Sequence, residues 1–362
     1  MRSLIVDTCY PAFLRDHYEA RPGLRERSYD EQWRALMDTF FGTADSYSYH
    51  LGIIGHEANE VVANCAPMQL AWAREHGLRL GRWAWQRQSN REAVVLAQAE
   101  ELRPDIVYVQ DLHFLGLGAL ARLRSLGSRV VGQIASAPPL PRKLRAFELV
   151  LTSFPHYVSA FRRLGVRSEY LRIGFDKRVL SRLEHDPPGS PGRAAVFVGA
   201  LNRRRHRTGN AIIAEAAARA PVDFWGYGAR GWSADSPVRR NYRGEAWGLD
   251  MYRALRAAPI AINRHIREAG DFANNMRLYE ATGVGTMLIT DAKRNLSELF
   301  APGREVVTYT TPGELADAVN HYLAQDEERE AIARAGQART LGEHTYRHRM
   351  EELVSILEQS LP

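Results

Sequence analysis

The residues best suited to chemistry lie in the segment NNMRLYEATGVGTMLIT, residues 274–290. Its pattern predicts a short helix over 276–282 that Asn275 caps, followed by a left-handed stop at Gly283 and a strand. A helix that begins at the carboxyl end of a parallel strand points free N–H groups and a positive dipole end at the sheet edge. Such a helix start binds phosphate groups, so the segment predicts a diphosphate site.

A carboxylate on the same helix extends the predicted site. Glu280 lies one turn after Met276 and Arg277, on the face that the helix start presents to a ligand. It can accept hydrogen bonds from the vicinal hydroxyls of a sugar. Asn274, Asn275 and Met276 are expected to act through backbone N–H groups. The alternative is that Glu280 only forms an exposed ion pair with Arg277, worth about 0.2–0.5 kcal/mol. We favour a nucleotide-sugar site.

Two other predicted strand ends carry residues that fit the same ligand. The motif GALNRRRHR begins at Gly199, and arginine forks suit phosphate oxygens. Arg203 and Arg205 are the preferred pair, because alternate residues of an extended chain share a face. Asn263, Arg264 and His265 lie at the carboxyl end of another predicted strand and are expected to face the same crevice, where ligands of open α/β sheets bind. A purely structural role for His265 is an equal alternative.

Candidate acceptor-binding and catalytic residues lie in the first half of the chain. Asp111 and His113 follow the predicted strand IVYVQ, where a carboxylate can act as the base on an acceptor hydroxyl. An inverting reaction needs such a base, whereas a retaining reaction does not. Asp7, Tyr10 and Gln133 are predicted to line an acceptor pocket. The alternatives are that Asp111 only caps the following helix and that Asp7 only caps a turn.

Short apolar strands alternate with helical patterns along the whole chain. Strands are expected at 4–7, 60–63, 105–110, 129–134, 148–152 and 169–173, and then at 194–199, 222–225, 260–263, 286–289 and 305–308. Continuous apolar strands separated by helices predict parallel sheets with both faces covered. The expected fold class is α/β, with two Rossmann-like doubly wound domains facing each other across a cleft.

A stretch dense in proline and glycine, HDPPGSPGR, divides the two alternating halves. The expected organisation is an N-terminal acceptor domain over 1–175, a linker over 176–193, a C-terminal donor domain over 194–345, and a final helix over 346–362 that can cross back to the first domain.

Several helix starts carry capping signals. Asp30 is expected to cap an early helix, and Asn295 with Glu298 fits a capping box. Thr311 combines the same device with a first-turn proline, Pro312.

Composition excludes several classes of protein. The 362 residues are 45% hydrophobic and 25% charged, which is ordinary for a globular protein. No apolar run approaches the roughly 20 residues of a membrane span, and a cytoplasmic location is expected. The net charge of +6 forms no dense basic stripe with interleaved aromatics, which argues against nucleic acid and allows at most weak peripheral membrane contact. Two cysteines and no Cys/His cluster predict neither a disulfide framework nor a metal site.

The segments NNMRLYEATGVG and LITDAKRNLSELFAPGREVVTYTTPGEL, with the tail AIARAGQARTLGEHTYRHRMEELVSIL, resemble the C-terminal domain of GT-B glycosyltransferases, nearest to the CgeB-like (spore-maturation-protein-like) branch. The resemblance covers about residues 245–355 and is looser in the N-terminal half. It implies a GT-B fold, a donor held by the C-terminal domain and no obligatory metal. In the related family-four enzymes, two glutamates frame the donor loop. Glu280 matches the second, which holds the donor ribose, whereas Phe272 replaces the first.

These observations predict a glycosyltransferase that moves a sugar from a nucleoside-diphosphate sugar to an acceptor hydroxyl or similar nucleophile. The nucleotide sugar is a co-substrate, and no separate cofactor or metal is expected. The acceptor is left open among a glycan, a natural product, a lipid and a protein. Two alternatives remain: a nucleotide-sugar epimerase of GT-B fold and a non-catalytic nucleotide-sugar-binding protein. Whether the anomeric configuration is retained or inverted also stays open.

Overall fold

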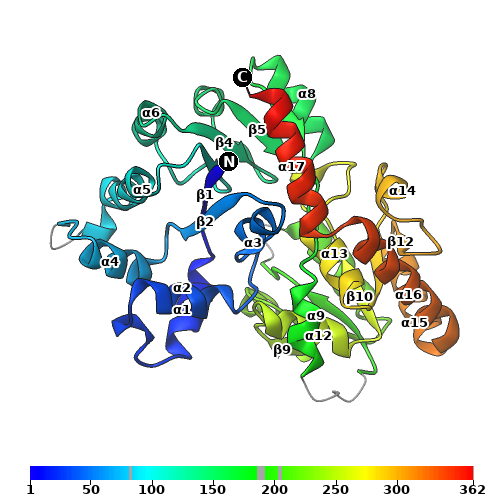
Figure 1. Cartoon of the computed structure of the whole chain (residues 1–362). Coiled ribbons are helices and arrows are strands. Elements are labelled where there is room, and N and C mark those ends of the chain that lie inside the picture. The colour runs from blue at the N-terminus through cyan, green and yellow to red at the C-terminus, as the bar shows by residue number, and fades with distance from the viewer. Residues whose placement is uncertain (81–83, 186–191, 203–205, 362) are drawn as a thin grey trace. The chain divides into compact units, whose positions relative to one another are not determined.

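The chain divides into two compact units, each built on its own six-stranded sheet (Figure 1). The computed structural model describes residues 1–80, 84–185, 192–202 and 206–361. Unit 1 comprises Met1–Arg172 and Arg349–Pro362, and unit 2 comprises Ile173–His348. All strand pairs in both sheets are parallel, which confirms the predicted class of two doubly wound α/β domains.

Unit 1 has the strand order β2-β1-β3-β4-β5-β6. Its strands are β1 (Arg2–Asp7), β2 (Glu57–Val62), β3 (Ile106–Val109), β4 (Arg129–Gln133), β5 (Leu149–Thr152) and β6 (Ser168–Tyr170). Its helices are α1 (Pro11–Glu19), α2 (Tyr29–Met37), α3 (Ser46–Ile53), α4 (Ala66–Glu75), α5 (Gln88–Leu102), α6 (Leu117–Ser125), α7 (Pro141–Leu144) and α8 (Pro155–Arg163).

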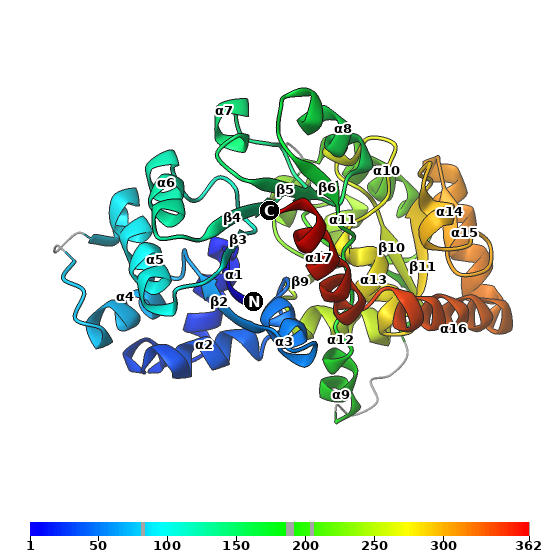
Figure 2. The same cartoon turned by 45° about the horizontal axis from the view of Figure 1, so that its top comes forward.

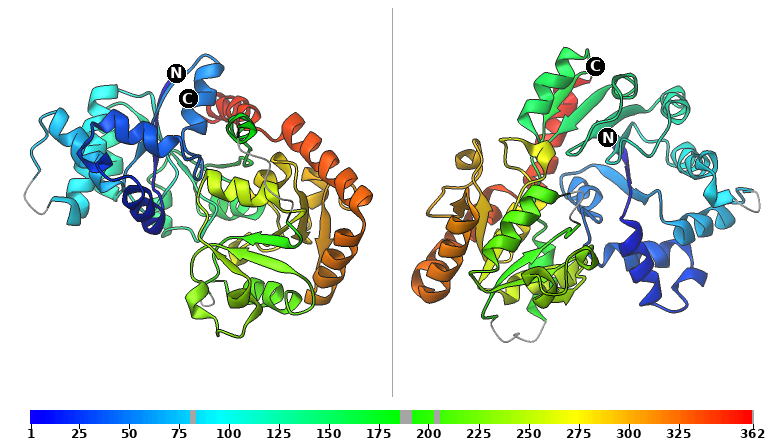
Figure 3. Two further views of the ribbon diagram at one scale, coloured as in Figure 1. Left: turned by 90° about the horizontal axis from the view of Figure 1, so that it is seen from below. Right: turned by 180° about the vertical axis from the view of Figure 1, so that it is seen from behind.

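The strands of unit 1 are buried on both faces because helices cover both sides. The strand β3 has four consecutive apolar residues, and all four are buried, as expected for a central parallel strand. Helices α5, α6 and α8 contribute to the core on one face, while α3 packs on β1 and β2. The terminal helix α17 (Tyr346–Ser360) lies beside α8 (Figure 3), where Arg167 donates a hydrogen bond to the Ser360 carbonyl at 3.0 Å.

Unit 2 has the strand order β12-β11-β10-β7-β8-β9. Its strands are β7 (Ala195–Val198), β8 (Val222–Trp225), β9 (Tyr242–Gly244), β10 (Ile260–Asn263), β11 (Met287–Asp291) and β12 (Val307–Tyr309). Its helices are α9 (Arg178–Glu184), α10 (Arg207–Ala216), α11 (Pro237–Arg240), α12 (Leu249–Ala257), α13 (Met276–Gly283), α14 (Leu296–Leu299), α15 (Pro312–Ala324) and α16 (Asp326–Glu343).

Helices also cover both faces of the second sheet (Figure 2). Helices α10 and α15 pack on one face through a shared apolar core, and α12 and α13 pack together with β7, β10 and β11. The helix α9 lies inside 176–193, which the sequence analysis treats as a linker without a helix.

Each sheet reverses its strand order once, and this reversal locates the sites. In unit 1 the chain passes from β1 outward to β2 and returns to β3 on the other side of β1. In unit 2 it passes from β7 to β8 and β9, and returns to β10 on the other side of β7. Open α/β sheets bind ligands outside the carboxyl ends of the strands at such a switch point. We therefore examine the strand ends of β1 and β3, and of β7 and β10.

Local capping signals were only partly predictive. Thr311 Oγ1 accepts a hydrogen bond from the Glu314 backbone N–H at 3.1 Å, so the predicted start of α15 is confirmed. The predicted cap at Asp30 is wrong, because Ser28 caps α2 through a capping box with Glu31. The capping box predicted at Asn295 is also wrong: its side chain instead bonds the backbone of the segment before α13.

The end of α13 corrects a second prediction. Gly283 is the last residue of the helix and does not have a positive φ, so the predicted left-handed stop is wrong there. Gly285 takes that conformation, with φ of 86°. Gly283 is needed for another reason: a Cβ at this position would lie 2.6 Å from the Phe175 ring. Close packing of α13 on Phe175 therefore requires glycine.

Candidate functional site

The loops after β7 and β8 pack too closely to admit a side chain between them. The Gly199 backbone N–H donates to the Trp225 carbonyl at 3.0 Å, which extends the strand pairing into the loops. A Cβ on Gly226, which has φ of 128°, would lie 1.9 Å from the Gly199 carbonyl oxygen. Bare backbone at a strand end lets a phosphate approach closely. Gly199, predicted as a donor residue, therefore lies at the unit 2 switch point.

Arg264 joins the strand ends that flank this switch point. Its Nε donates to Asn210 Oδ1 at 2.8 Å, and its Nη2 donates to the Ala200 carbonyl at 3.0 Å. The guanidinium also lies over the Phe197 ring, 5.5 Å from the centroid. Burial lowers the pKa of Arg264 below its usual range. The arginine therefore fixes the loop after β7 against β10, and it adds a buried positive charge to the site.

The start of α13 is fixed to β10 by two asparagine side chains. Asn275 Nδ2 donates to Asn263 Oδ1 at 2.9 Å and to the Arg264 carbonyl at 3.1 Å. Asn263 Nδ2 in turn donates to Thr290 Oγ1 at 3.0 Å. Asn275 occupies the predicted cap position, but its side chain makes no cap hydrogen bond to the helix. Within the described chain, the first N–H groups of α13 thus have no side-chain cap, and they remain suited to an anion.

Asn274, the residue before the cap position, is held by a hydrogen bond from α13. Its Oδ1 accepts the Tyr279 hydroxyl at 2.9 Å, and the side chain is buried. Met276, the first residue of α13, is half-buried. Arg203 and Arg205, predicted as phosphate ligands, lie outside the described residues.

Glu280 and Arg277 form a buried pair. Arg277 Nη1 lies 2.9 Å from Glu280 Oε2, and the two side chains are only 15% and 7% exposed. The sequence alternative of an exposed pair is therefore wrong about exposure. Burial raises the pKa of the Glu280 carboxyl, and the charge of Arg277 partly opposes that rise. The structure gives no hydrogen bond to this carboxylate from the described residues, so it can accept bonds from ligand hydroxyls.

His265 and Asp291 form a dyad at the carboxyl ends of β10 and β11. The His265 Nδ1 lies 2.7 Å from Asp291 Oδ1, and the same oxygen accepts the His265 backbone N–H at 3.0 Å. Burial raises the pKa of Asp291, but the hydrogen bond and charge of His265 and the charge of Lys293 outweigh it and lower that pKa. His265 Nε2 is buried and has no hydrogen-bond partner among the described residues.

The switch point of unit 1 carries two carboxyl groups, those of Asp7 and Asp111. Asp7 ends β1 and is half-buried, and its Oδ1 accepts the Thr8 backbone N–H at 2.7 Å. Burial raises the pKa of Asp7 to about 7; the Thr8 N–H opposes the rise, and the charge of Asp111 adds to it. A carboxyl group with such a pKa can take and release a proton near neutrality.

Asp111 and His113 are held by local contacts. Asp111 accepts the Thr8 hydroxyl at 2.9 Å and the His113 backbone N–H at 2.9 Å. His113 Nε2 lies 3.0 Å from the Ala137 carbonyl oxygen. Lys143 Nζ donates to the His113 carbonyl at 3.1 Å. Asp111 thus caps the turn after β3 and not the following helix, whose N-cap is Gly116, so the helix-cap alternative is wrong.

The other two predicted acceptor residues, Gln133 and Tyr10, have different surroundings. Gln133 Oε1 accepts both the Tyr47 and the Tyr108 hydroxyls at 2.9 Å, so its carbonyl is fully used inside unit 1. Tyr10 precedes α1 and is 55% exposed.

The sequence analysis missed Asp291 and the positioning role of Arg264. Asp291 was detectable, since Asn263 pairs with Thr290 in the parallel register and the next residues must then lie close together. In the part of the chain that the structure describes, no group of three His, Cys, Asp or Glu residues is placed to hold a metal ion. No described helix is both long enough and apolar enough to cross a bilayer.

Comparison with known proteins supports this reading of the fold. A family model described as "Glycosyl transferase-like" matches residues 203–355, which fall in unit 2 and the start of α17. No curated protein matches the chain.

Three solved structures are similar over almost the full chain. HepE of Anabaena in complex with UDP-glucose is 14% identical with a TM-score of 0.63, covering 99% of this chain and 100% of that one. The sucrose-phosphate synthase of Thermosynechococcus elongatus is 11% identical with a TM-score of 0.59, covering 99% and 98%. A glycosyltransferase involved in avilamycin A biosynthesis is 14% identical with a TM-score of 0.59, covering 100% and 98%. The chain therefore has the fold of the GT-B glycosyltransferases, with a glycosyl transferase-like domain over residues 203–355.

Proposed function

We propose that this protein is a glycosyltransferase that takes a sugar from a nucleoside-diphosphate sugar bound at the unit 2 switch point. The acceptor, which carries a hydroxyl or similar nucleophile, binds to unit 1. The reaction uses no metal ion and takes place in the cytoplasm. The chain is assigned to the CgeB-like branch, on the motifs quoted above.

The observation that carries this proposal is the orphan nitrogen of His265. Buried polar atoms almost always have a hydrogen-bond partner, and leaving one without a partner costs about 1–3 kcal/mol. His265 Nε2 has none among the described residues, although Asp291 fixes its ring from the other side. It lies at the end of β10, beside the switch point. A ligand oxygen at this position would satisfy it.

Two further groups of unit 2 match two adjacent parts of a nucleotide sugar, the diphosphate and the ribose. The uncapped start of α13 offers backbone N–H groups and a positive dipole end to the diphosphate. The Glu280 carboxylate is buried, and among the described residues Arg277 is the one cation that pairs with it. It can therefore accept both hydroxyls of a ribose, the role that the family resemblance implies.

In the transfer step, the bond between the sugar C1 and the diphosphate oxygen breaks, and the diphosphate leaves with the electron pair. The acceptor oxygen forms the new bond to C1 and loses its proton. The buried charges of Arg264 and Arg277 and the start of α13 stabilise the negative charge of the leaving diphosphate. This electrostatic support takes the place of a metal ion.

For an inverting transfer, Asp7 is the group in unit 1 best suited to take the acceptor proton. Its pKa of about 7 lets it be ionised and still basic near neutral pH. Asp111 is less suited, because Thr8 and the turn after β3 already use both of its oxygens. Asp111 is then a positioning residue that also helps to raise the pKa of Asp7.

The test is a transfer assay with purified protein. UDP-, GDP-, ADP- and dTDP-linked sugars and CMP sugars are incubated with and without a set of hydroxyl acceptors. We expect release of the free nucleotide and a new glycoside with one donor, at a rate that increases with the acceptor. A new sugar isomer that stays linked to the nucleotide, formed without acceptor, would identify an epimerase. Donor binding with no reaction would identify a non-catalytic binding protein. Either result would overturn the proposal.

A further inference from the structure

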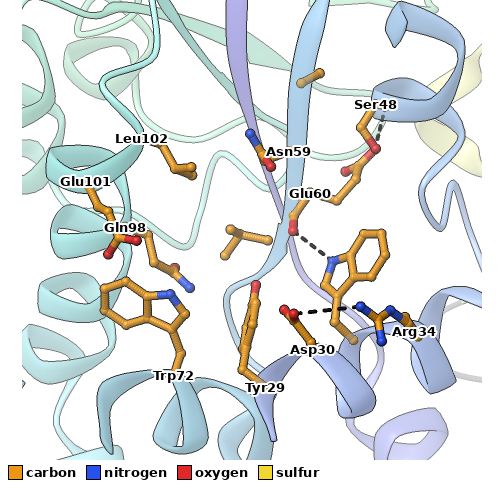
Figure 4. Close-up of a pocket in the computed structure, with 13 residues that line it drawn as sticks. Tyr29, Asp30, Arg34, Ser48, Asn59, Glu60, Trp72, Gln98, Glu101 and Leu102 are labelled. Carbon is orange, nitrogen blue, oxygen red and sulfur yellow. Dashed lines mark hydrogen bonds and ion pairs between the residues drawn. The ribbon is translucent and has the colours of Figure 1, made fainter. Parts of the chain in front are cut away.

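A cavity in unit 1 lies apart from the switch point, beside the edge strand β2 (Figure 4). It has a volume of about 290 Å³ and is lined by residues of α2, α3, β2, α4 and α5. From β2 it is lined by Ala58, Asn59, Glu60 and Val61. The switch point, in contrast, lies at the carboxyl ends of β1 and β3. The cavity is therefore a separate feature of the flank of the sheet.

Three aromatic side chains form walls of this cavity. Trp33 is fixed by a hydrogen bond from its Nε1 to the Glu60 carbonyl at 2.9 Å. Trp72 is fixed by stacking on His76, with ring centroids 4.1 Å apart. Tyr29 stands between the Trp72 and Asp30 side chains, with its hydroxyl directed into the cavity (Figure 4). Fixed aromatic faces offer a large apolar contact area to a bound ring.

Gln98, on α5, is the polar group that makes this cavity a binding site. The residue is 2% exposed and lines the cavity, and neither its amide nitrogen nor its amide oxygen has a hydrogen-bond partner among the described residues. A second buried glutamine of unit 1, Gln32, uses both ends: its oxygen accepts the Tyr18 hydroxyl, and its nitrogen donates to the Arg27 carbonyl. Gln98 therefore offers one donor and one acceptor to a ligand.

The charges around the cavity disfavour an anion. Asp30, Glu60 and Glu101 line it, and Arg34 is its only lining cation among the described residues. Arg34 already lies 3.8 Å from Asp30. Burial raises the pKa of the Glu60 carboxyl well above its usual range, so burial opposes its ionisation. A phosphate or carboxylate ligand would therefore find no unpaired cation among the described lining residues.

Polar groups lie on several sides of the cavity. In Figure 4, Asn59 lies above the centre, Gln98 and Glu101 to the left and Asp30 below. A pyranose ring carries hydroxyls around its whole edge and apolar C–H faces that pack on indoles. The volume is at the low end of the roughly 300–1,000 Å³ of small-molecule pockets, so it suits one ring.

We propose that this cavity binds one neutral pyranose ring, either a free monosaccharide or the end unit of a glycan chain. The ring packs between the aromatic walls, and Gln98 exchanges two hydrogen bonds with its hydroxyls. The inference does not depend on the proposed transferase activity, because none of the residues that form this cavity belongs to the switch points. A water-filled cavity is the outcome that the experiment must exclude.

The experiment is a titration of the full chain, observed through the indole N–H signals of its seven tryptophans in nitrogen-15-labelled protein. The probes are glucose, galactose, mannose, N-acetylglucosamine and their short oligosaccharides, with adenosine and inorganic phosphate as comparison ligands. We expect the Trp33 and Trp72 signals to shift saturably with one sugar, and the signal of Trp232, which lies in unit 2, to stay unchanged. Tighter binding of an oligosaccharide than of its monosaccharide identifies a glycan end as the source, and equal binding identifies the free sugar.

Matched variants separate binding from folding. Gln98→Leu removes both amide contacts without exposing a new polar group, and it is expected to weaken sugar binding roughly tenfold or more without lowering Tm. Gln69→Leu is the control: Gln69 is buried in the same unit but does not line the cavity, so sugar affinity should stay within about twofold even if Tm falls. Trp33→Ala provides a second loss variant. No saturable shift with any sugar, or equal affinity in Gln98→Leu and wild type, would overturn the proposal. Saturable binding of adenosine or phosphate alone would do the same.

Discussion

The two switch points share one topology and differ in chemistry. In unit 1, the ends of β1 and β3 bring together the carboxyl groups of Asp7 and Asp111. In unit 2, the ends of β7 and β10 bring together Arg264 and His265, with an uncapped helix start close by. Parallel α/β architecture thus fixes where a ligand can bind, and the side chains at that edge determine its charge. The acidic edge suits a nucleophile that must lose a proton, and the cationic edge suits a diphosphate.

The largest expected effect comes from Asp7→Asn, which removes the proposed base. Proton transfer by a positioned group contributes about 10²–10⁴-fold, so the transfer kcat should fall by about that factor while donor affinity stays constant. In the wild type, the rate should fall as the pH drops below about 7, where Asp7 becomes protonated. Asp105→Asn, at an exposed carboxylate before β3, is the control. A wild-type kcat in Asp7→Asn would contradict the role of Asp7 as the base, and with it the proposed chemical difference between the two switch points.

The same variant has a stability signature of known sign. The raised pKa means that folded protein keeps a proton on Asp7 between about pH 4 and 7, where the unfolded chain releases it. Wild-type stability should therefore decrease as the pH rises through this window. Asp7→Asn should have a higher Tm than the wild type at pH 8 and no advantage at pH 4. Thermal denaturation at the two pH values measures this difference.

Glu280→Gln tests the proposed ribose contact in unit 2. Hydrogen bonds to a charged group contribute about 1.5–3 kcal/mol, so donor Kd should rise roughly 10–100-fold. Isothermal titration calorimetry with the active nucleotide sugar measures the change. Asp250→Asn is the matched control, because Asp250 forms an exposed pair with Arg253 at the same three-residue spacing. Its donor Kd should stay within about twofold of wild type.

Asp291→Asn tests whether Asp291 contributes to the reaction by orienting His265. Asp291 orients the His265 ring, so the variant should lower kcat/KM by about tenfold and leave His265 in place. His265→Ala should lower it at least as much. If Asp291→Asn leaves the kinetics unchanged while His265→Ala abolishes donor binding, the histidine acts without its carboxylate partner.

The smallest expected effect is that of Gly283→Ala on the free energy of unfolding, through the packing of α13. Gly283→Ala would force a Cβ to within 2.6 Å of the Phe175 ring, and overpacking of this kind costs about 1–3 kcal/mol. Gly342→Ala, in open space near the end of α16, should instead gain up to about 1 kcal/mol. Urea denaturation compares the two. Gly283→Ala should also weaken donor binding, because it displaces α13, and leave the unit 1 cavity unaffected.

The positions of strands and helices could be predicted from the sequence where they depend on the spacing of apolar residues. The four strand residues Ile260–Asn263 were located to the residue, because an apolar run between turn signals leaves little freedom. The start of α13 was located for the same reason. Its chemistry was less predictable: Asn275 stands at the cap position but binds Asn263, a residue far away in sequence. Local capping preference was outweighed by a tertiary hydrogen bond.

The pKa values of the site residues could not be predicted from the sequence. Nothing in the local pattern distinguishes Asp7 from Asp111, yet burial gives Asp7 its pKa of about 7. The unit 1 cavity could not be predicted either, since Trp33, Trp72 and Gln98 lie on three separate helices. Arg203 and Arg205 stay a prediction, as they lie outside the described residues.

The most direct test of the central claim is a thermal-shift measurement with UDP-, GDP-, ADP- and dTDP-linked sugars and CMP sugars. Binding to the folded protein at ten or more times Kd should raise Tm by about 3 °C or more for one nucleotide. The account predicts that this rise persists in Asp7→Asn and is reduced in Glu280→Gln. A Tm unmoved by every nucleotide sugar, or an equal rise in Glu280→Gln and wild type, would contradict donor binding at the unit 2 switch point.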